Sequence, residues 1–516
     1  MSIGFESLFL HHGLSAMDEG WPLHAAMELV DGRTLYSEVF WVFPPGHLLP
    51  AWIAYALDPP GIILARTIYA GFTVAACIAF LFVARRLMPP DFALLAALLI
   101  AVAAPRSHFE HLLFGYRYLV WSAVALLFFH LRLDRNDSRW LFPAGLFTGI
   151  ALAFRLTPAF AVAVAIGVGI AAASRDWRRW IREGLLYSAG LLVVWLPILL
   201  WMHDSVGLER FWIEMVVRPV EMTALQSKPI PPLFYRNLDW RNLGFAFAAF
   251  AFRAYLVLYL GFLVALFYRW GRAVVERRPF DRVFLLTFVV FGAVYFVRSM
   301  GRSDLPHLDS AIPPVAVLLA YLASRSTRFR LFRSGPDGHA SRFPRLALQI
   351  GLLLAWIVLI GSNQFLDQAR TMGRTPLENV SSRIYVKPRS LGWVIDQLIP
   401  VIRRHADADD TILVMSHAPL IYVLTERHSP GSFDLIMPGT FRTPDEERST
   451  IARLESDPPA VVVWPRQAFD RNPERGLDRS APELWRWILD HYRPVATSPL
   501  YRILVPKIGV RDGRDT

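Results

Sequence analysis

The chain has 516 residues, of which 54% are hydrophobic, and its mean hydropathy is +0.35. A soluble globular protein needs fewer apolar residues to build its core, so many of the apolar side chains of this chain are expected to face lipid. The chain has a net charge of +11, and its basic residues fall mostly in short segments between apolar runs. This distribution is typical of a polytopic membrane protein and argues against nucleic-acid binding. The single cysteine, Cys77, excludes a disulfide framework and a cysteine-based metal site.

Residues 17–61 form a polar and aromatic stretch ahead of the first long apolar run. The stretch opens with two adjacent carboxylates, Asp18 and Glu19, and holds the turn-rich passage GRTLYSEVFWVFPPG. It continues into HLLPAWIAYAL, which predicts a helix too short to cross a bilayer and suited to lying in the interface. The acidic pair has two interpretations: charges that favour the positive end of a starting helix, or side chains at the mouth of a reaction chamber.

Ten apolar runs predict membrane-spanning helices. They are 62–83, 91–104, 118–132, 141–153, 157–174, 184–202, 244–269, 283–298, 310–323 and 346–362. With this count the arginine-rich loops all fall on one side, which the positive-inside rule makes cytoplasmic. The loops 1–61, 105–117, 203–243 and 299–309 then face outward, together with everything after residue 363. Because the N-terminus also falls outside, we expect a further transmembrane helix upstream of the assigned start; the alternative is that this chain crosses the membrane differently at its beginning.

Residues 364–516 change character and predict a small soluble α/β domain on the outer face. Short apolar runs of strand length alternate with turn residues and charged helices. The predicted strands are TILVMSH, LIYVLTE, FDLIM, AVVVW and YRILV. Two helices are predicted to start with capping boxes, at Thr443–Glu446 and Ser480–Glu483. The expected fold is thus a polytopic α-helical membrane domain, residues 1–363, followed by an extracytoplasmic α/β domain, residues 364–516.

The order of features in residues 17–66 resembles the first outer loop of the C-type (GT-C) glycosyltransferase superfamily. These features are the acidic pair, a helix ending in Gly-x-x-x-Tyr, an aromatic segment, Pro-Pro, a lateral helix and a span with an early arginine, Arg66. The stretch is similar in particular to the bacterial protein O-mannosyltransferase, lipid A aminoarabinose transferase and lipopolysaccharide-core transferase branch. Lipid A-directed relatives tend to carry a lysine just before the proline, whereas this chain has VFPPG, which weakens a lipid A reaction here.

The resemblance implies a bundle of ten or eleven spans and an enzyme of the inner membrane. Such an enzyme transfers a sugar, with inversion, from a polyprenyl-phosphate donor to a hydroxyl of a glycolipid, polysaccharide or protein. It implies that Asp18 is the catalytic base and that Glu19 supports it. A carboxylate base in a partly dehydrated cavity contributes about 10²–10⁴-fold to the rate.

A phosphate leaving group needs cations more than it needs a proton, so arginines in outward loops are candidate donor-phosphate ligands. Arg298, Arg302 and His307 lie in the stretch VRSMGRSDLPHLDSAIPP, whose alternative is a solvated loop with internal ion pairs. Arg117 and Arg155 lie at the outer ends of short spans. Arg155 interrupts an apolar hairpin and is either functional or a snorkelling arginine. We expect Arg66 to pair with an outer-loop carboxylate.

No cofactor is certain, although a divalent cation would suit a phosphate substrate. His108, Glu110 and His111 are weak candidates, because their spacing is not that of a zincin and such histidines are usually solvated. The long outward loop 203–243 fits either a lid over the acceptor or a surface-lying helix that closes the bundle. Two alternatives to a transferase stay open, a flippase for a lipid-linked glycan and a non-catalytic membrane partner of the same architecture.

Overall fold

Each of the ten predicted spans coincides with a helix of the computed structural model. The structure describes the chain outside residues 1–3, 5–6, 103–115, 231, 233–242, 304–306, 309, 327–341, 357–371, 416, 434, 469–470 and 508–516. The bundle helices are α4 (Ile62–Leu87), α5 (Pro90–Val102), α6 (Leu119–Arg135), α7 (Leu141–Phe154), α8 (Leu156–Ala173), α9 (Trp177–Val206), α12 (Leu243–Val275), α13 (Val283–Gly301), α15 (Ile312–Ser326) and α16 (Arg342–Trp356).

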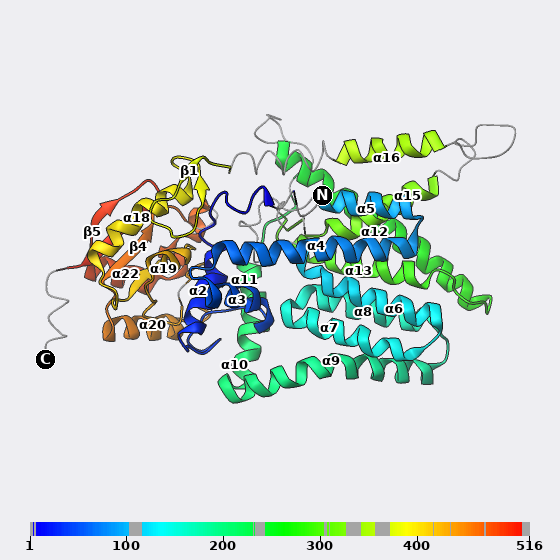
Figure 1. Cartoon of the computed structure of the whole chain (residues 1–516). Coiled ribbons are helices and arrows are strands. Elements are labelled where there is room, and N and C mark those ends of the chain that lie inside the picture. Colours follow the sequence, from blue (N-terminus) through cyan, green and yellow to red (C-terminus); the bar gives the residue numbers. More distant parts are fainter. Residues whose placement is uncertain are drawn as a thin grey trace.

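Within the described ranges, five helices are long and apolar enough to cross a membrane: α4, α8, α9, α13 and residues 249–275 of α12. The remaining bundle helices are shorter, as their apolar runs in the sequence suggest. Most of the bundle helices run side by side, and the described residues after 371, here called the C-terminal part, pack at one end of them (Figure 1). The fold is therefore that of a polytopic helical membrane protein with an appended α/β part.

Helices from two of the loops that the sequence predicts to face outward, called the outer loops below, lie at that same end of the bundle (Figure 1). The first loop forms α2 (Gly20–Val30), the turn η1 (Pro45–Leu48) and α3 (Leu49–Leu57), so the predicted short lateral helix is present. The second loop continues α9 through α10 (Leu208–Trp212), a π-helical turn at Ile213–Val217 and α11 (Arg218–Leu225). Residues 208–225 are thus helical.

The C-terminal part contains a four-stranded sheet of order β3-β4-β6-β5. Strands β3 (Ile412–Val414) and β4 (Val461–Pro465) are parallel, whereas β6 (Tyr501–Pro506) is antiparallel to β4 and to β5 (Tyr492–Thr497). A small antiparallel pair, β1 (Thr375–Pro376) and β2 (Tyr385–Val386), precedes the sheet. The helices of this part are α18 (Leu391–His405), α19 (Leu420–Thr425), α20 (Pro444–Ser456), α21 (Leu477–Ser480) and α22 (Pro482–His491).

Three of the five predicted strands are confirmed, since TILVMSH, AVVVW and YRILV contain β3, β4 and β6. The prediction for LIYVLTE is wrong, because Leu420–Thr425 forms helix α19. All six residues of α19 are buried, and a short run that is apolar on every side does not reveal its period. FDLIM contributes no strand among its described residues. Strand β5 was not predicted.

One of the two predicted capping boxes is confirmed at its hydroxyl. Thr443 accepts a hydrogen bond from Glu446 N at 3.3 Å and caps α20. The second box is wrong, since α22 begins after Ala481 with no side-chain cap from Ser480. Glu447 of α20 replaces it, accepting a bond from the backbone N–H of Leu484 at 2.8 Å.

One buried apolar cluster joins the outer end of the bundle to the C-terminal part. It contains Leu23 of α2 and Ile62 of α4 together with Ile395 of α18, Leu420 of α19 and Val461 of β4. A shared core fixes the two parts against each other, because any separation would expose these side chains to water. The site described next lies where they meet.

Candidate active site

A cavity of about 960 Å³ lies between the bundle, the outer-loop helices and the C-terminal part. From the bundle and its outer loops come Met17, Asp18, Trp21, Val42, Phe43, Pro44, Arg155, Leu156, Thr157, Pro219, Met222, Thr223, Gln226, Val297, Arg298, Gly301, Arg302 and His307. From the C-terminal part come Leu391, His417, Met437, Pro465, Gln467, Ala468, Arg471, Leu500 and Tyr501. The lining is therefore part apolar and part cationic.

Asp18 lies in this lining, directly before helix α2. Its backbone N–H donates to Ser15 Oγ at 3.3 Å, which fixes the turn that delivers the carboxylate to the cavity. Helix α2 starts at Gly20 with Glu19 as its N-cap residue. The first turn of α2 contains no acidic residue and Glu19 makes no side-chain cap, so the helix-start interpretation of the acidic pair is not supported, whereas Asp18 does line a cavity.

Glu19 points elsewhere, into a fully buried ion pair with Arg66 of α4. Arg66 Nε donates a hydrogen bond to Glu19 Oε1 at 2.6 Å, Arg66 Nη2 donates one to Glu19 Oε2 at 2.9 Å, and neither side chain is exposed. Arg66 also donates to the carbonyls of Leu10 and Gly13. The prediction that Arg66 pairs with an outer-loop carboxylate is confirmed, and the pair anchors the residue next to Asp18 to the bundle.

The structure brings four of the five predicted phosphate ligands, Arg155, Arg298, Arg302 and His307, into the cavity with Asp18. Arg155 occupies the extended junction between α7 and α8 and is 5% exposed. Its guanidinium carbon lies 5.1 Å from the centroid of the Phe43 ring, a cation–π distance that holds the charge in place.

The two arginines at the end of α13 are held by their surroundings. Arg298 donates to Tyr295 Oη at 3.4 Å and to Ser310 Oγ at 3.3 Å. Arg302 and Lys228 form an isolated parallel β-bridge. Beside it, Ser303 N donates a hydrogen bond to Lys228 O at 3.0 Å. The segment after α11 therefore lies against the arginine-bearing loop.

The fifth predicted phosphate ligand, Arg117, does not line the cavity. It is buried, and its guanidinium carbon lies 5.3 Å from the centroid of the Tyr69 ring. The weak metal candidates His108, Glu110 and His111 lie outside the described residues, as do Asp304 and Asp309. In the described part of the chain, no group of three or more His, Cys, Asp or Glu residues could hold a metal ion.

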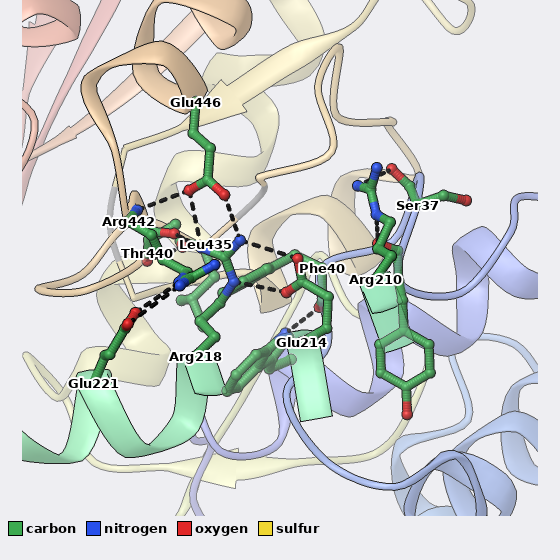
Figure 2. Close-up of polar contacts among 12 residues, drawn as sticks. Ser37, Phe40, Arg210, Glu214, Arg218, Glu221, Leu435, Thr440, Arg442 and Glu446 are labelled. Carbon is green, nitrogen blue, oxygen red and sulfur yellow. Dashed lines mark hydrogen bonds and ion pairs between the residues drawn. The ribbon is translucent and has the colours of Figure 1, made fainter. Parts of the chain in front are cut away.

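Helix α11 forms one wall of the cavity through Pro219, Met222, Thr223 and Gln226. At its start, Arg218 donates to Glu214 at 2.6 Å and to Glu446 of α20 at 2.7 Å, and a further bond joins it to the carbonyl of Thr440 (Figure 2). Burial alone would raise the pKa of Glu446, but hydrogen bonds from Arg218 and Arg442 lower it on balance.

Two more contacts tie α11 to the C-terminal part. Arg442 donates to Glu221 at 2.6 Å (Figure 2), and Gln226 donates to the carbonyl of Pro438 at 3.0 Å. The described part of the 203–243 loop thus contains helix α11, which lines the cavity and is bonded to the C-terminal part. The i,i+4 spacing of Glu214 and Arg218 was the sequence signal for this network. The other partner of Arg218, Glu446, is far away in the sequence.

Sequence reasoning missed the contribution of the C-terminal part to the lining. His417, Gln467 and Arg471 were not among the predicted site residues, although all three line the cavity. His417 ends the predicted strand TILVMSH, and Gln467 and Arg471 follow the predicted strand AVVVW. Polar residues at the ends of buried strands were the signal that pointed to them.

Comparison with solved structures shows which architecture this is. The fold is similar to that of ArnT from Cupriavidus metallidurans bound to undecaprenyl phosphate, with a TM-score of 0.58 and 14% identity over 99% of this chain and 98% of that one. The apo state of the same protein matches with a TM-score of 0.53 and 15% identity, over 98% and 96% of the two chains. The chain thus has the fold of the C-type glycosyltransferase superfamily.

The model of glycosyltransferase family 87 matches residues 41–300, half of the chain. The chain therefore belongs to glycosyltransferase family 87, and it is a multi-pass membrane glycosyltransferase. A search of curated proteins found no match. The matched segment includes Arg155 and Arg298 but ends before the C-terminal part.

Proposed function

We propose that this protein transfers a sugar from a polyprenyl-phosphate donor to a hydroxyl acceptor, with inversion at the anomeric carbon. The observation that carries the proposal is a single cavity that Asp18, Arg155, Arg298 and Arg302 all line. A base and a set of phosphate-binding cations are the two groups that this reaction needs.

In the proposed reaction, the carboxylate of Asp18 accepts the proton of the acceptor hydroxyl while that oxygen attacks the anomeric carbon. The bond from this carbon to the phosphate oxygen breaks, and its electron pair leaves with polyprenyl phosphate. Arg155, Arg298, Arg302 and His307 stabilise the negative charge that builds up on the leaving phosphate. The undecaprenyl phosphate bound in the similar ArnT structure supports a lipid carrier of this kind.

We further propose that the cavity faces the extracytoplasmic side of the inner membrane and that residues 364–516 form an extracytoplasmic domain. The arginine-rich loops between the other ends of the helices support this orientation. The apolar side chains in the lining suit a donor that enters from the membrane.

The first experiment measures release of polyprenyl phosphate by the purified protein in nanodiscs of native membrane lipids, which supply acceptor hydroxyls, with a panel of polyprenyl-phosphate sugars. Asp18→Asn keeps the shape of the side chain and removes the base, so release is expected to fall by about 10²–10⁴-fold. Arg302→Ala removes a charged phosphate contact and is expected to lower release by about 10- to 100-fold.

Asp58→Asn is the matched control, because Asp58 is an exposed carboxylate at the end of α3 and does not line the cavity. We expect this variant to retain the activity of the unmodified protein. If the folded protein binds donors but releases polyprenyl phosphate from none of them, the transferase proposal is wrong, and a flippase or non-catalytic role takes its place.

A further inference from the structure

Two buried serines connect the end of α13 to the start of α15, beside the cations of the cavity. Ser299 lies in the last turn of α13, and Ser310 lies two residues before α15 begins at Ile312. Both serines are 1% exposed, although serine side chains usually lie at the protein surface. A polar group that is buried to this extent needs hydrogen-bond partners within the protein, so its contacts show what it holds in place.

The backbone carbonyl of His307 accepts a hydrogen bond from each of the two serines. Ser299 Oγ donates to this oxygen at 2.8 Å, and Ser310 Oγ donates to it at 2.7 Å. A carbonyl oxygen has two lone pairs, so the two hydroxyls together use its acceptor capacity. His307 lines the cavity, and its backbone is thereby fixed both to α13 and to the turn before α15.

The hydroxyl of Ser310 has a defined orientation because of this bond. A hydroxyl carries a single hydrogen, and that of Ser310 points at the His307 carbonyl, so the oxygen presents its lone pairs to other donors. Arg298 Nη1 donates a hydrogen bond to this oxygen at 3.3 Å. The result is a chain of two hydrogen bonds, from Arg298 through Ser310 to the backbone of His307, in which each bond polarises the other.

Tyr295 provides a second acceptor for the same nitrogen. Tyr295 lies one turn before Arg298 in α13, and its Oη accepts a hydrogen bond from Arg298 Nη1 at 3.4 Å. Tyr295 is 2% exposed, and its ring stacks on that of Phe291 with 6.3 Å between the centroids. Because Nη1 carries two hydrogens, two acceptors that the protein holds in place fix the direction of the planar guanidinium.

The backbone on both sides of Ser310 is held by the core of the bundle. Leu308, Ala311 and Ile312 are at most 2% exposed and belong to the large buried apolar cluster of the bundle. Ala311 N donates to Leu308 O at 2.9 Å and closes the turn that carries Ser310. The packing of its neighbours therefore determines where the Ser310 hydroxyl lies.

We propose that Ser310 is a positioning residue of the reaction, which acts through Arg298 by fixing its guanidinium in the direction of the leaving phosphate. The negative charge on this phosphate grows as its bond to the sugar breaks, so a cation that is already aligned stabilises the transition state most. Ser299 contributes indirectly, because it helps to hold the carbonyl that orients the Ser310 hydroxyl. This inference rests on the proposed transferase function and adds a residue that acts in it without contacting the donor.

The test removes the acceptor with Ser310→Ala in the full chain in nanodiscs. We expect the turnover number for polyprenyl phosphate release to fall about tenfold and KM for the donor to change less than twofold, because the phosphodiester of the donor carries less charge than the phosphate that leaves. Binding of undecaprenyl phosphate should weaken about five- to tenfold. Binding of undecaprenol, which has no phosphate, should change less than twofold.

Ser324→Ala is the matched control. Ser324 is 2% exposed and donates to the carbonyl three residues earlier, that of Tyr321, at 2.7 Å, as Ser310 does to His307. Ser324 lies at the far end of α15 and is not among the described residues that line the cavity. We expect turnover and undecaprenyl phosphate binding to stay within twofold of the unmodified protein, so any general effect of removing a buried serine hydroxyl is measured separately.

A double variant shows whether Ser310 acts through Arg298. In an Arg298→Ala background the positioned group is absent, so adding Ser310→Ala should change undecaprenyl phosphate binding less than twofold. Tyr295→Phe keeps the ring and removes the other acceptor, which provides a second measurement if Ser310→Ala does not fold. It should weaken binding of undecaprenyl phosphate about two- to fivefold and leave binding of undecaprenol unchanged.

Four results would overturn the inference: unchanged turnover and undecaprenyl phosphate binding in Ser310→Ala, an equal loss for undecaprenol, an equal loss when Arg298 is already absent, or the same losses in the Ser324→Ala control. Failure of the transferase function itself is separate, because it appears as a lack of polyprenyl phosphate release by the unmodified protein with every donor. An active enzyme that Ser310→Ala does not affect refutes only the positioning role.

Discussion

At the scale of single residues, the site places two adjacent carboxylates in opposite surroundings. Asp18 lines the cavity, whereas Glu19 is completely buried against Arg66. A buried bidentate pair fixes geometry well but leaves no carboxylate oxygen available for a substrate proton. We therefore assign the reactive role to Asp18 and propose that Glu19 supports it by positioning.

This assignment predicts that Glu19→Gln chiefly lowers stability. The variant leaves the Arg66 charge buried without its counterion, at a cost of about 3–5 kcal/mol, so the midpoint of thermal unfolding should fall. Asp18→Asn should leave this midpoint nearly unchanged. In the double variant Glu19→Gln/Arg66→Met the uncompensated charge is absent, and part of the lost stability should return. A Glu19→Gln protein with the unfolding midpoint of the unmodified protein would contradict the prediction that this ion pair stabilises the fold.

The charged and titratable residues that the bundle and its loops contribute to the cavity could be located from sequence, because they lie at the ends of apolar runs or in the loops between them. Arg155 and Arg298 stand out against apolar neighbours, and Asp18 lies in a stretch that resembles the first outer loop of the superfamily. Arg117 has the same sequence signal, but its guanidinium packs over the ring of Tyr69 and not against the cavity. Whether an arginine at a helix end turns toward the cavity or into the bundle depends on helix rotation, which a hydrophobic run does not determine.

At the scale of secondary-structure elements, the contact between α2 and α19 controls where Asp18 lies. Leu420 at the start of α19 donates its N–H to Ala16 O at 3.1 Å, just before Asp18. A Cβ on Gly20 would lie 2.2 Å from Leu420 N, so only glycine permits this approach. The C-terminal part thus helps to position the first outer loop.

The predicted consequence is that Gly20→Ala lowers activity by moving Asp18. The methyl group must push α2 away from the backbone of α19, and misplacement of a catalytic group by about 1 Å can cost about 10²-fold in rate. Polyprenyl phosphate release and donor binding are measured side by side, with release expected to fall far more than binding. Gly71→Ala is the control, because no atom lies within 4 Å of the corresponding Cβ in α4. Full activity of Gly20→Ala would show that the contact does not position the base.

The elements of the bundle were predictable because lipid-facing helices require long apolar runs, and all ten runs became helices. The helices and strands of the C-terminal part were less predictable. Helix α19 was mistaken for a strand because it is buried on every side. Strand β5 was missed because Pro494 interrupts it, and the sheet accommodates that proline at a register shift between Pro494 and Ala496. Tertiary packing decided both cases.

At the scale of the whole molecule, ionic contacts join the first outer loop to the C-terminal part at the far end of α2 from Asp18. His428 Nδ1 lies 3.2 Å from both carboxylate oxygens of Glu28, and Arg33 Nε lies 2.9 Å from Glu28 Oε2. Asp31 lies 3.7 Å from His428 Nε2. The hydrogen bond to Glu28 raises the pKa of His428 above its usual 6.5, although burial and Arg33 oppose the shift.

The sign of the pH dependence follows from these two groups. A raised histidine pKa means that protonated His428 stabilises the folded state below pH 6.5, and that this contribution is lost as the pH rises through the folded-state pKa. Burial alone would raise the pKa of Glu28, but the hydrogen bond with His428 and the charges of His24 and Arg33 lower it below 4.5. Its contribution is present above pH 4.5 and lost on further acidification.

We therefore expect the contact between the two parts to be strongest between about pH 4.5 and 6.5 and to weaken above this range. His428→Gln should lower the midpoint of thermal unfolding clearly at about pH 6 and much less at about pH 8.5, where the unmodified histidine has lost its proton. His405→Gln, which changes an exposed histidine at the end of α18, should have no such effect. Because His428 is partly exposed, added salt should reduce the difference at pH 6. An equal effect of His428→Gln at both pH values would mean that His428 contributes packing to this interface and that its charge does not join the outer loop to the C-terminal part.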